Sequence, residues 1–117
     1  MKQFALALCS LGFALSAAAA DSSSDAGLAE VRELGRLNGQ ALACSYTPVA
    51  SRLKAIMIQH APKSRRYGEA FETATNQAFL AQTKSNQAVC EDATTFSRQA
   101  EVLAMRLQAV IPSAPPR

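Results

Sequence analysis

The segment VCEDATTFSRQAEVLAMRLQAV, residues 89–110, has the most regular apolar spacing in the chain. Its apolar residues step alternately by four and three positions: Val89, Ala93, Phe96, Ala100, Leu103, Leu107 and Val110. This spacing places all of them on one face of an α-helix, as in a helix that packs against partner helices. We expect the helix to end at Ile111-Pro112, because the residue before a proline avoids helical backbone.

Two segments nearer the N-terminus, at about residues 24–44 and 64–83, also space apolar residues by three or four positions. In the first, the spacing continues across Asn38-Gly39, so we expect one unbroken helix, with Ser23 or Ser24 as its cap. In the second, the apolar stripe consists of Tyr67, Phe71, Ala74, Ala78 and Ala81. The polar residues 84–87 that follow predict a loop.

The remaining helix is predicted between Thr47-Pro48 and Ala61-Pro62. The Thr47 hydroxyl can cap the first turn, where a proline is also well tolerated because its missing N–H has no helical partner. Short connections make sequential helices antiparallel. The sequence therefore predicts an all-α fold, an antiparallel up-down-up-down four-helix bundle in which the first and fourth helices are neighbours.

Residues 1–20 have the three parts of a secretory signal peptide. Lys2 gives a positive start, residues 4–15 are almost wholly apolar, and Ala18-Ala19-Ala20 supplies the small residues of a cleavage site. A mature membrane-spanning helix needs about 20 apolar residues, and neither this run nor any other segment is long enough. The predicted parts are a signal peptide at 1–20, a helical bundle domain at 21–111 and a disordered C-terminal tail at 112–117. We expect a periplasmic or secreted protein.

Removal of the signal peptide leaves two of the three cysteines, Cys44 and Cys90. Two cysteines in an oxidising compartment most simply form a disulfide. The predicted bundle places both cysteines at the same end, one at the end of the first helix and one at the start of the fourth. We therefore expect one disulfide that closes the bundle.

Charge is distributed unevenly along the chain, which carries a formal net charge of +3. Residues 34–68 contain no acid, whereas residues 21–33 and 69–101 are acidic on balance. Within the basic block, the segment Lys63-Ser64-Arg65-Arg66-Tyr67 begins a predicted helix, where the helix dipole disfavours cations. The candidate anion-binding or partner-binding residues are Arg52, Lys54, His60, Lys63, Arg65, Arg66 and Tyr67. The alternative is a solvated corner between two helices.

Motifs for catalysis or cofactor binding are absent from the sequence. His60 is the only histidine, no haem-attachment motif is present, and Met57 lies on the same helix as His60. Zinc sites, nucleophile motifs, phosphate-binding loops and dinucleotide-binding glycines are also missing. We therefore expect a protein without a cofactor, metal or enzymatic activity. The basic segment is too small, and has too few interleaved aromatic residues, for nucleic-acid binding.

These properties indicate a small exported helical protein that acts by binding. Its partner is expected to be another exported protein, for which it serves as an accessory subunit, inhibitor or immunity-type protein. The alternatives are a periplasmic stress chaperone and a bundle that binds a small anionic ligand. In size, compartment and single bridge the chain resembles periplasmic acid-stress chaperones and the immunity proteins of secreted toxins, which implies a helical architecture but no residue roles. One histidine is few for a steep acid switch.

Overall fold

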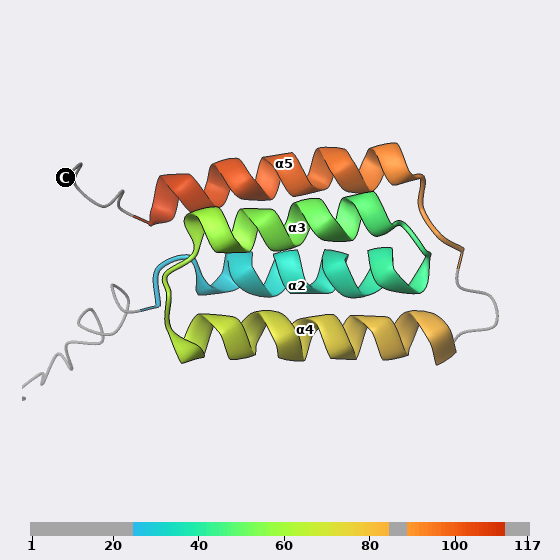
Figure 1. The fold of residues 1–117 in the computed structure, drawn as a ribbon, viewed down its shortest axis with the longest axis horizontal. Helices are drawn as coiled ribbons and strands as arrows, with labels where there is room; N and C mark the ends of the chain where they lie inside the picture. Colours follow the sequence, from blue (N-terminus) through green and yellow to red (C-terminus); the bar gives the residue numbers. More distant parts are fainter. Residues whose placement is uncertain (1–24, 85–88, 112–117) are drawn as a thin grey trace, which may run out of the picture.

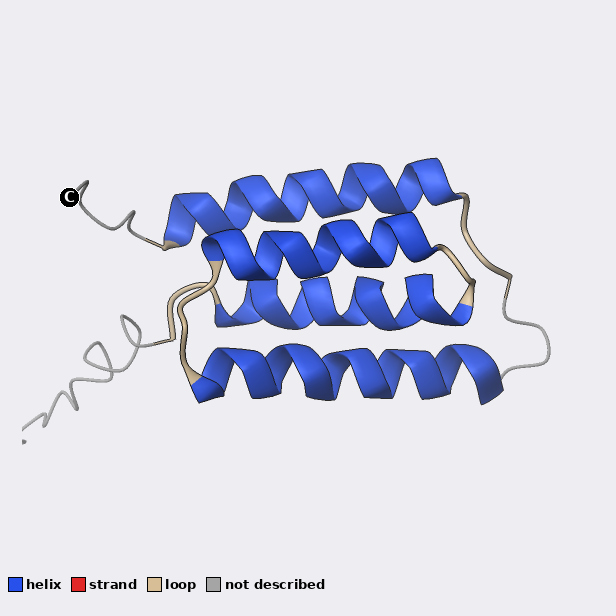
Figure 2. Cartoon of the chain, viewed as in Figure 1, coloured by secondary structure: helices blue, strands red, loops and turns tan. Residues whose placement is uncertain are grey.

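The computed structural model describes residues 25–84 and 89–111. Within these ranges the chain forms four helices and no strand (Figures 1 and 2). The helices are α2 (Leu28–Ala43), α3 (Thr47–His60), α4 (Arg65–Lys84) and α5 (Ala93–Val110). The predicted all-α class and the number of helices are confirmed for the described residues.

Several predictions fall outside the described residues. They concern the signal peptide at 1–20, the capping serines Ser23 and Ser24, most of the polar loop at 84–87 and the tail at 112–117.

Helix α3 begins at Thr47, as predicted, but the capping role of Thr47 and the predicted start of the last helix are wrong. Thr47 does not cap α3, because it is the first residue of that helix and Tyr46 takes the cap position. Val89 does not belong to the apolar face of α5, since it lies before the helix and is 86% exposed. The backbone at Asp92 is extended, so the helix begins only at Ala93. Cys90, next to Val89, forms a disulfide with Cys44. The segment just before α5 is therefore joined to the end of α2 and is not part of a helix.

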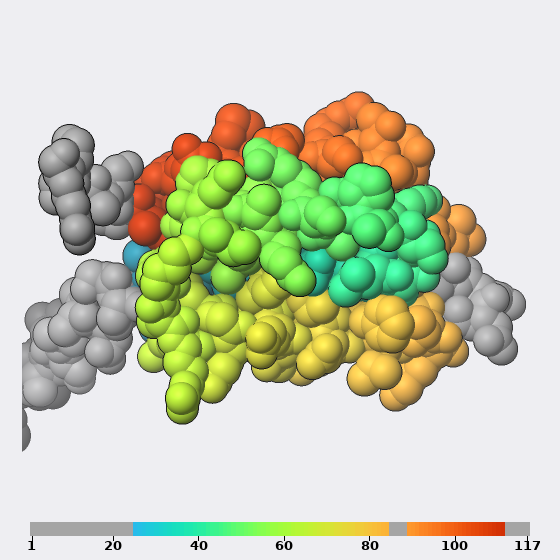
Figure 3. All heavy atoms as spheres, viewed as in Figure 1, coloured from blue at the N-terminus to red at the C-terminus, as the bar shows by residue number. Residues whose placement is uncertain are grey.

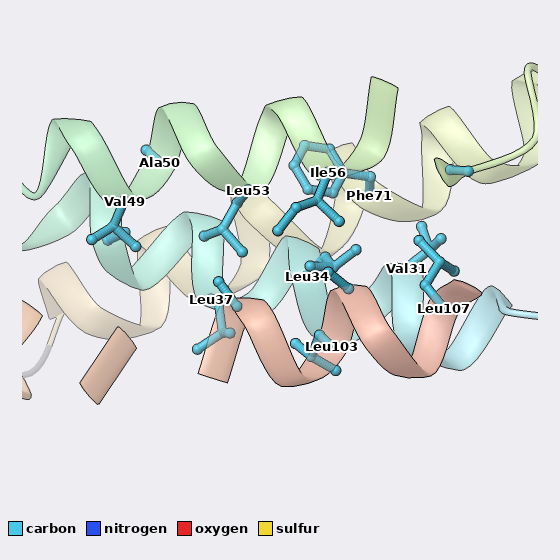
Figure 4. Packing of buried hydrophobic residues seen from close by; sticks show 14 of the residues in the cluster. Val31, Leu34, Leu37, Val49, Ala50, Leu53, Ile56, Phe71, Leu103 and Leu107 are labelled. Atoms are coloured by element: carbon cyan, nitrogen blue, oxygen red, sulfur yellow. The ribbon is translucent and has the colours of Figure 1, made fainter. Parts of the chain in front are cut away.

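The core is formed mainly by α2, α3 and α5, and Tyr67 and Phe71 of α4 also belong to it. Its largest fully buried side chains are Val31, Leu34, Leu37, Leu53, Ile56 and Leu107, and most of these are seen in Figure 4. Helix α2 packs against each of the other three helices, and α3 packs against α5. In the space-filling view, α2 is visible only in small areas between α3 and α4 (Figure 3). Helix α2 is therefore the central element of the fold.

Helix α4 does not lie beside α3 and α5, its neighbours in the sequence. Among the described helices, its backbone comes close to that of α2 only, and Figure 1 shows it at the edge of the molecule, with α5 at the opposite edge. Tyr67 and Phe71 are the residues of α4 that are buried. In the described ranges, α4 therefore does not complete a ring of four helices, because its backbone is close to neither α3 nor α5.

Two glycines allow α2 and α4 to approach each other closely. A Cβ atom built on Gly35 would lie 2.5 Å from the Phe71 carbonyl oxygen, and one on Gly39 would overlap the carbonyl oxygen of Thr75. The helix continues through Asn38 and Gly39, as predicted. The glycines therefore stay within the helix and leave room for the α4 backbone.

Cys44 and Cys90 form a disulfide, with their Sγ atoms 2.07 Å apart. Cys44 caps the C-terminal end of α2, and Cys90 lies three residues before α5. The predicted pairing is confirmed. The bond ties the chain that leads into α5 to the end of the central helix.

Candidate functional site

The candidate basic residues do not form one cluster. Arg52 lies on α3 and makes two hydrogen bonds to Glu101 of α5, at 2.7 and 3.0 Å. These contacts lower the pKa of the Glu101 carboxyl, through the hydrogen bond first and the charge of Arg52 as well, and raise the pKa of Arg52. Lys54, further along α3, is exposed and has no ion pair among the described residues. Arg52 thus links two helices rather than pointing freely into solvent.

His60 is half-buried at the end of α3, beside α5. Its Nε2 atom lies 3.4 Å from Nε2 of Gln108. Within the described ranges, no three histidine, cysteine, aspartate or glutamate side chains are grouped in a way that suits a metal ion. The position of His60 therefore favours a contact between helices.

The cations that precede and begin α4 have separate contacts. Lys63 donates a hydrogen bond from Nζ to the carbonyl oxygen of Ile58. The Arg65 side chain is 89% exposed, and its Nε lies 4.0 Å from the carboxylate of Glu69. An Arg66 guanidinium nitrogen lies 2.6 Å from Oδ1 of Asp25. The angle at this contact does not meet the requirement for a hydrogen bond, so Asp25 Oδ1 accepts none. The contact is therefore an ion pair.

Tyr67 is buried rather than presented to a ligand. Its side chain is among the buried residues of the core, and its hydroxyl donates a hydrogen bond to the carbonyl oxygen of Ala26, over 2.7 Å. The tyrosine therefore fastens the first turn of α4 to the segment that leads into α2.

A groove of about 1130 Å³ runs between α2 and α4. Helix α2 provides one wall and α4 the other. The residues that line it are Leu28, Arg32, Glu33, Arg36, Gln40, Arg65, Arg66, Glu69, Ala70, Thr73, Ala74, Gln77, Ala78, Ala81 and Gln82. Two of the predicted residues, Arg65 and Arg66, belong to this groove. The other five do not.

The two ends of the groove differ in charge. Five of its charged residues lie near the starts of the two helices, and Arg36 lies in the middle of α2. The five are Arg32, Glu33, Arg65, Arg66 and Glu69. The other end is lined by alanine, threonine and glutamine. The lining residues include two more arginines than glutamates, and Asp25, outside the lining, contacts Arg66. The groove can therefore hold an elongated ligand with one anionic end.

Arg32 and Arg36 were not among the predicted site residues. Arg36 contacts Glu33 at 2.8 Å, whereas Arg32 has no ion pair among the described residues. A sequence signal exists, because two arginines four positions apart lie on one face of a helix. When charges are summed over blocks of sequence, Arg32 falls in the acidic block 21–33 and Arg36 in the basic block that follows. The two arginines are then not recognised as neighbours.

Comparison of the chain with protein-family models, with curated proteins and with solved structures gives no match. Of the helices in the described ranges, none has the length and apolar character required to cross a membrane. The possible role of the groove therefore rests on its geometry and charge.

Proposed function

We propose that this protein is exported and acts by binding another exported protein, as an accessory subunit, inhibitor or immunity-type partner. The observation that carries the proposal is the groove between α2 and α4. In the described part of the chain it is lined by α2 and α4, and it has both a charged end and an uncharged end.

The position of α4 supports this proposal. A helix in a bundle usually buries its apolar face against more than one neighbour. Among the described helices, the backbone of α4 comes close to that of α2 only. Phe79 and Leu80 of α4, which do not line the groove, are 38% and 52% exposed. A partner helix beside α4 would bury surface that the isolated chain leaves open to water, which is favourable for apolar atoms.

The alternating direction of the helices is part of the proposal. In Figure 1, α2 and α4 begin at one end of the molecule, and α3 and α5 begin at the other. This view supports the up-down-up-down order. In the proposed architecture, α2, α3 and α5 form most of the core and α4 lies along α2. The disulfide joins the C-terminal end of α2 to the segment that leads into α5.

The export part of the proposal is supported by the signal-like residues 1–20 and by the disulfide, which is compatible with an oxidising compartment. Mass spectrometry of protein recovered from outside the cytoplasm should find a mature N-terminus at or near Asp21. Recovery there of chains that still begin at Met1 would contradict cleavage.

Site-specific photocrosslinking in the cells that make the protein tests the binding role. A photoreactive residue at Thr73 or Gln77 reports on the groove, and the same residue at Lys54 or Arg98 reports on exposed positions of α3 and α5. We expect a discrete adduct with one exported protein from at least one position. Absence of an adduct from all four positions, in exported and folded protein, would contradict the proposal.

A further inference from the structure

We infer that the groove binds a helix of the partner protein that runs antiparallel to α2 and α4 and carries carboxylates near its C-terminal end. This inference rests on the proposed binding function and names the chemistry of the partner. It follows from three properties of the groove: its small side chains, its charged end and the direction of its two helices.

The small side chains permit close approach of a helix. Ala70, Ala74, Ala78 and Ala81 follow one another along the wall that α4 provides. The distance between packed helices is about 8–10 Å and depends on the side chains at the contact, so alanines favour the short end of that range. Thr73 and Gln77 lie beside them and offer hydrogen bonds at the edge.

The charged end selects for acidic residues. Three arginines of the groove already contact a carboxylate: Arg36 lies 2.8 Å from Glu33, Arg65 lies 4.0 Å from Glu69, and Arg66 lies 2.6 Å from Asp25. The first two contacts are exposed, and exposed pairs of this kind are readily exchanged for better partners. Arg32 has no such contact within the described ranges. Guanidinium groups bind carboxylates through paired hydrogen bonds, so carboxylates are the chemistry that this end fits.

The direction of the helices sets the orientation of the partner. Figure 1 shows that α2 and α4 begin at the same end of the molecule. Three arginines of the groove, Arg32, Arg65 and Arg66, lie in the first turns of these helices, and Arg36 lies in the middle of α2. The N-terminal end of a helix carries a partial positive charge and its C-terminal end a partial negative charge. A third helix in the groove is therefore favoured when its C-terminal end lies beside the arginines.

A second copy of this chain does not supply such a helix within the described residues. The last turns of α2, α3, α4 and α5 contain no aspartate or glutamate, and α3 and α4 end with His60 and Lys84. A free anion such as phosphate would engage only the arginines and would leave the alanine-lined half unused. The groove therefore fits a helix from a different protein.

Two synthetic peptides of identical composition test the inference. Each is a helical, alanine-rich peptide of about 18 residues, or five turns, with capped ends. One has its glutamates in the last turn, and the other has them in the first. Fluorescence anisotropy with the full mature protein should show tighter binding of the first peptide by about tenfold, because the arginines and helix dipoles then act together. Added salt should weaken that preference.

Variants show where the peptide binds. Arg32→Gln with Arg36→Gln should abolish the preference between the two peptides. The matched control is Arg98→Gln with Arg106→Gln, which removes two exposed arginines from α5 and should leave binding unchanged. Circular dichroism of both variants establishes that they remain folded.

Several outcomes would overturn the inference. They are equal affinity for the two peptides, an unchanged preference in the Arg32 and Arg36 variant, full competition by inorganic phosphate, and preferential binding to vesicles of anionic lipid. The result is separable from the crosslinking test. Adducts from Lys54 or Arg98 alone would support the proposed function and contradict binding in the groove. Orientation-dependent peptide binding without any adduct would support binding in the groove and contradict the proposed function.

Discussion

Asn38 of α2 donates a hydrogen bond from Nδ2 to Oγ1 of Thr75 on α4, over 3.2 Å. The Thr75 hydroxyl in turn donates to the carbonyl oxygen of Phe71, at 2.8 Å. Asn38 is only 4% exposed. Its side-chain amide is therefore buried in the contact between α2 and α4. A buried amide needs a partner, so this short chain of hydrogen bonds fixes how α4 sits on α2.

Thr75→Val should therefore destabilise the protein. Valine has nearly the same shape as threonine, but it removes the acceptor for the buried Asn38 amide. An unsatisfied buried donor costs about 1–3 kcal/mol. Chemical denaturation of the two proteins measures the difference in the free energy of unfolding. Thr73→Val is the matched control, because Thr73 is exposed on the same helix and should change stability by less than about 0.5 kcal/mol. Equal effects at the two positions would mean that the hydrogen bond has no net value.

Gly39→Ala should also destabilise the protein, although alanine is the better helix former. The new Cβ would overlap the carbonyl oxygen of Thr75, which is backbone and does not rotate away. Overpacking of this kind costs about 1–3 kcal/mol. Gly68→Ala is the control, since a Cβ there would meet no atom within 4 Å other than its chain neighbours and the backbone of its own helix, and it should stabilise the protein by about 0.5–1 kcal/mol. Thermal unfolding of both variants should show shifts of opposite sign. A stabilised Gly39→Ala would contradict the close approach of the two helices.

The disulfide should contribute strongly to stability. Loss of a native disulfide from a small exported domain costs about 2–5 kcal/mol. We expect Cys44→Ala with Cys90→Ala to unfold at a lower denaturant concentration than the oxidised protein, and to be insensitive to reductant. The oxidised and reduced native chains provide the comparison. Unfolding curves that coincide would show that the bond contributes little.

The Arg52–Glu101 pair should make stability depend on pH in the acidic range. Arg52 lowers the pKa of the Glu101 carboxyl in the folded protein, whereas the unfolded carboxyl titrates near pH 4.3, the ordinary value for glutamate. The stabilisation is thus complete above about pH 4.3 and is lost as the pH falls through the lower folded value. The effect is small because both side chains are roughly half exposed, at 43% and 53%.

Glu101→Gln isolates this contribution. Between neutral and acidic pH, the melting temperature of the variant should fall less than that of the native protein. Glu72→Gln changes an exposed carboxylate that has no ion pair in the described part of the chain, and it should follow the native curve. If the native protein and Glu101→Gln lose the same stability on acidification, the pair is not formed in solution.

The spacing of apolar residues predicted the helices because it reports which face of each helix is buried. Leu103 and Leu107 lie in the core as their spacing indicates. Val89 matches the same spacing but lies outside the helix, since the pattern carries no information on where a disulfide redirects the chain. The attachment of α4 to α2 depends on Gly35 and Gly39. These glycines lie four positions apart on one side of α2, and which helix approaches them follows only from the fold.

The candidate site shows the same limit. The basic segment around Arg65 was found from local composition, and part of it lies at the charged end of the groove. Arg32 and Arg36 belong to that end as well, although they precede Arg65 by about thirty positions in the sequence. Which cations share a surface depends on how α4 is rotated about α2, and a single sequence does not specify that rotation. Tyr67 was part of the predicted apolar stripe and also a candidate binding residue, and its burial agrees with its place in the stripe.

Lys63 and Arg65 provide the sharpest test between the groove and the basic segment as a whole. Lys63 precedes α4 and contacts the Ile58 carbonyl, whereas Arg65 lines the groove. Both side chains are exposed, so Lys63→Glu and Arg65→Glu should each change stability by less than about 0.5 kcal/mol. At Arg65, the helix dipole favours the new carboxylate, and repulsion from Glu69 four residues later offsets that gain. The yield of adduct from a photoreactive residue at Gln77 should fall in Arg65→Glu and persist in Lys63→Glu, because only the first places a negative charge where the partner's carboxylates are expected. The opposite result, loss with Lys63→Glu and retention with Arg65→Glu, would place the docking surface at the connection between α3 and α4.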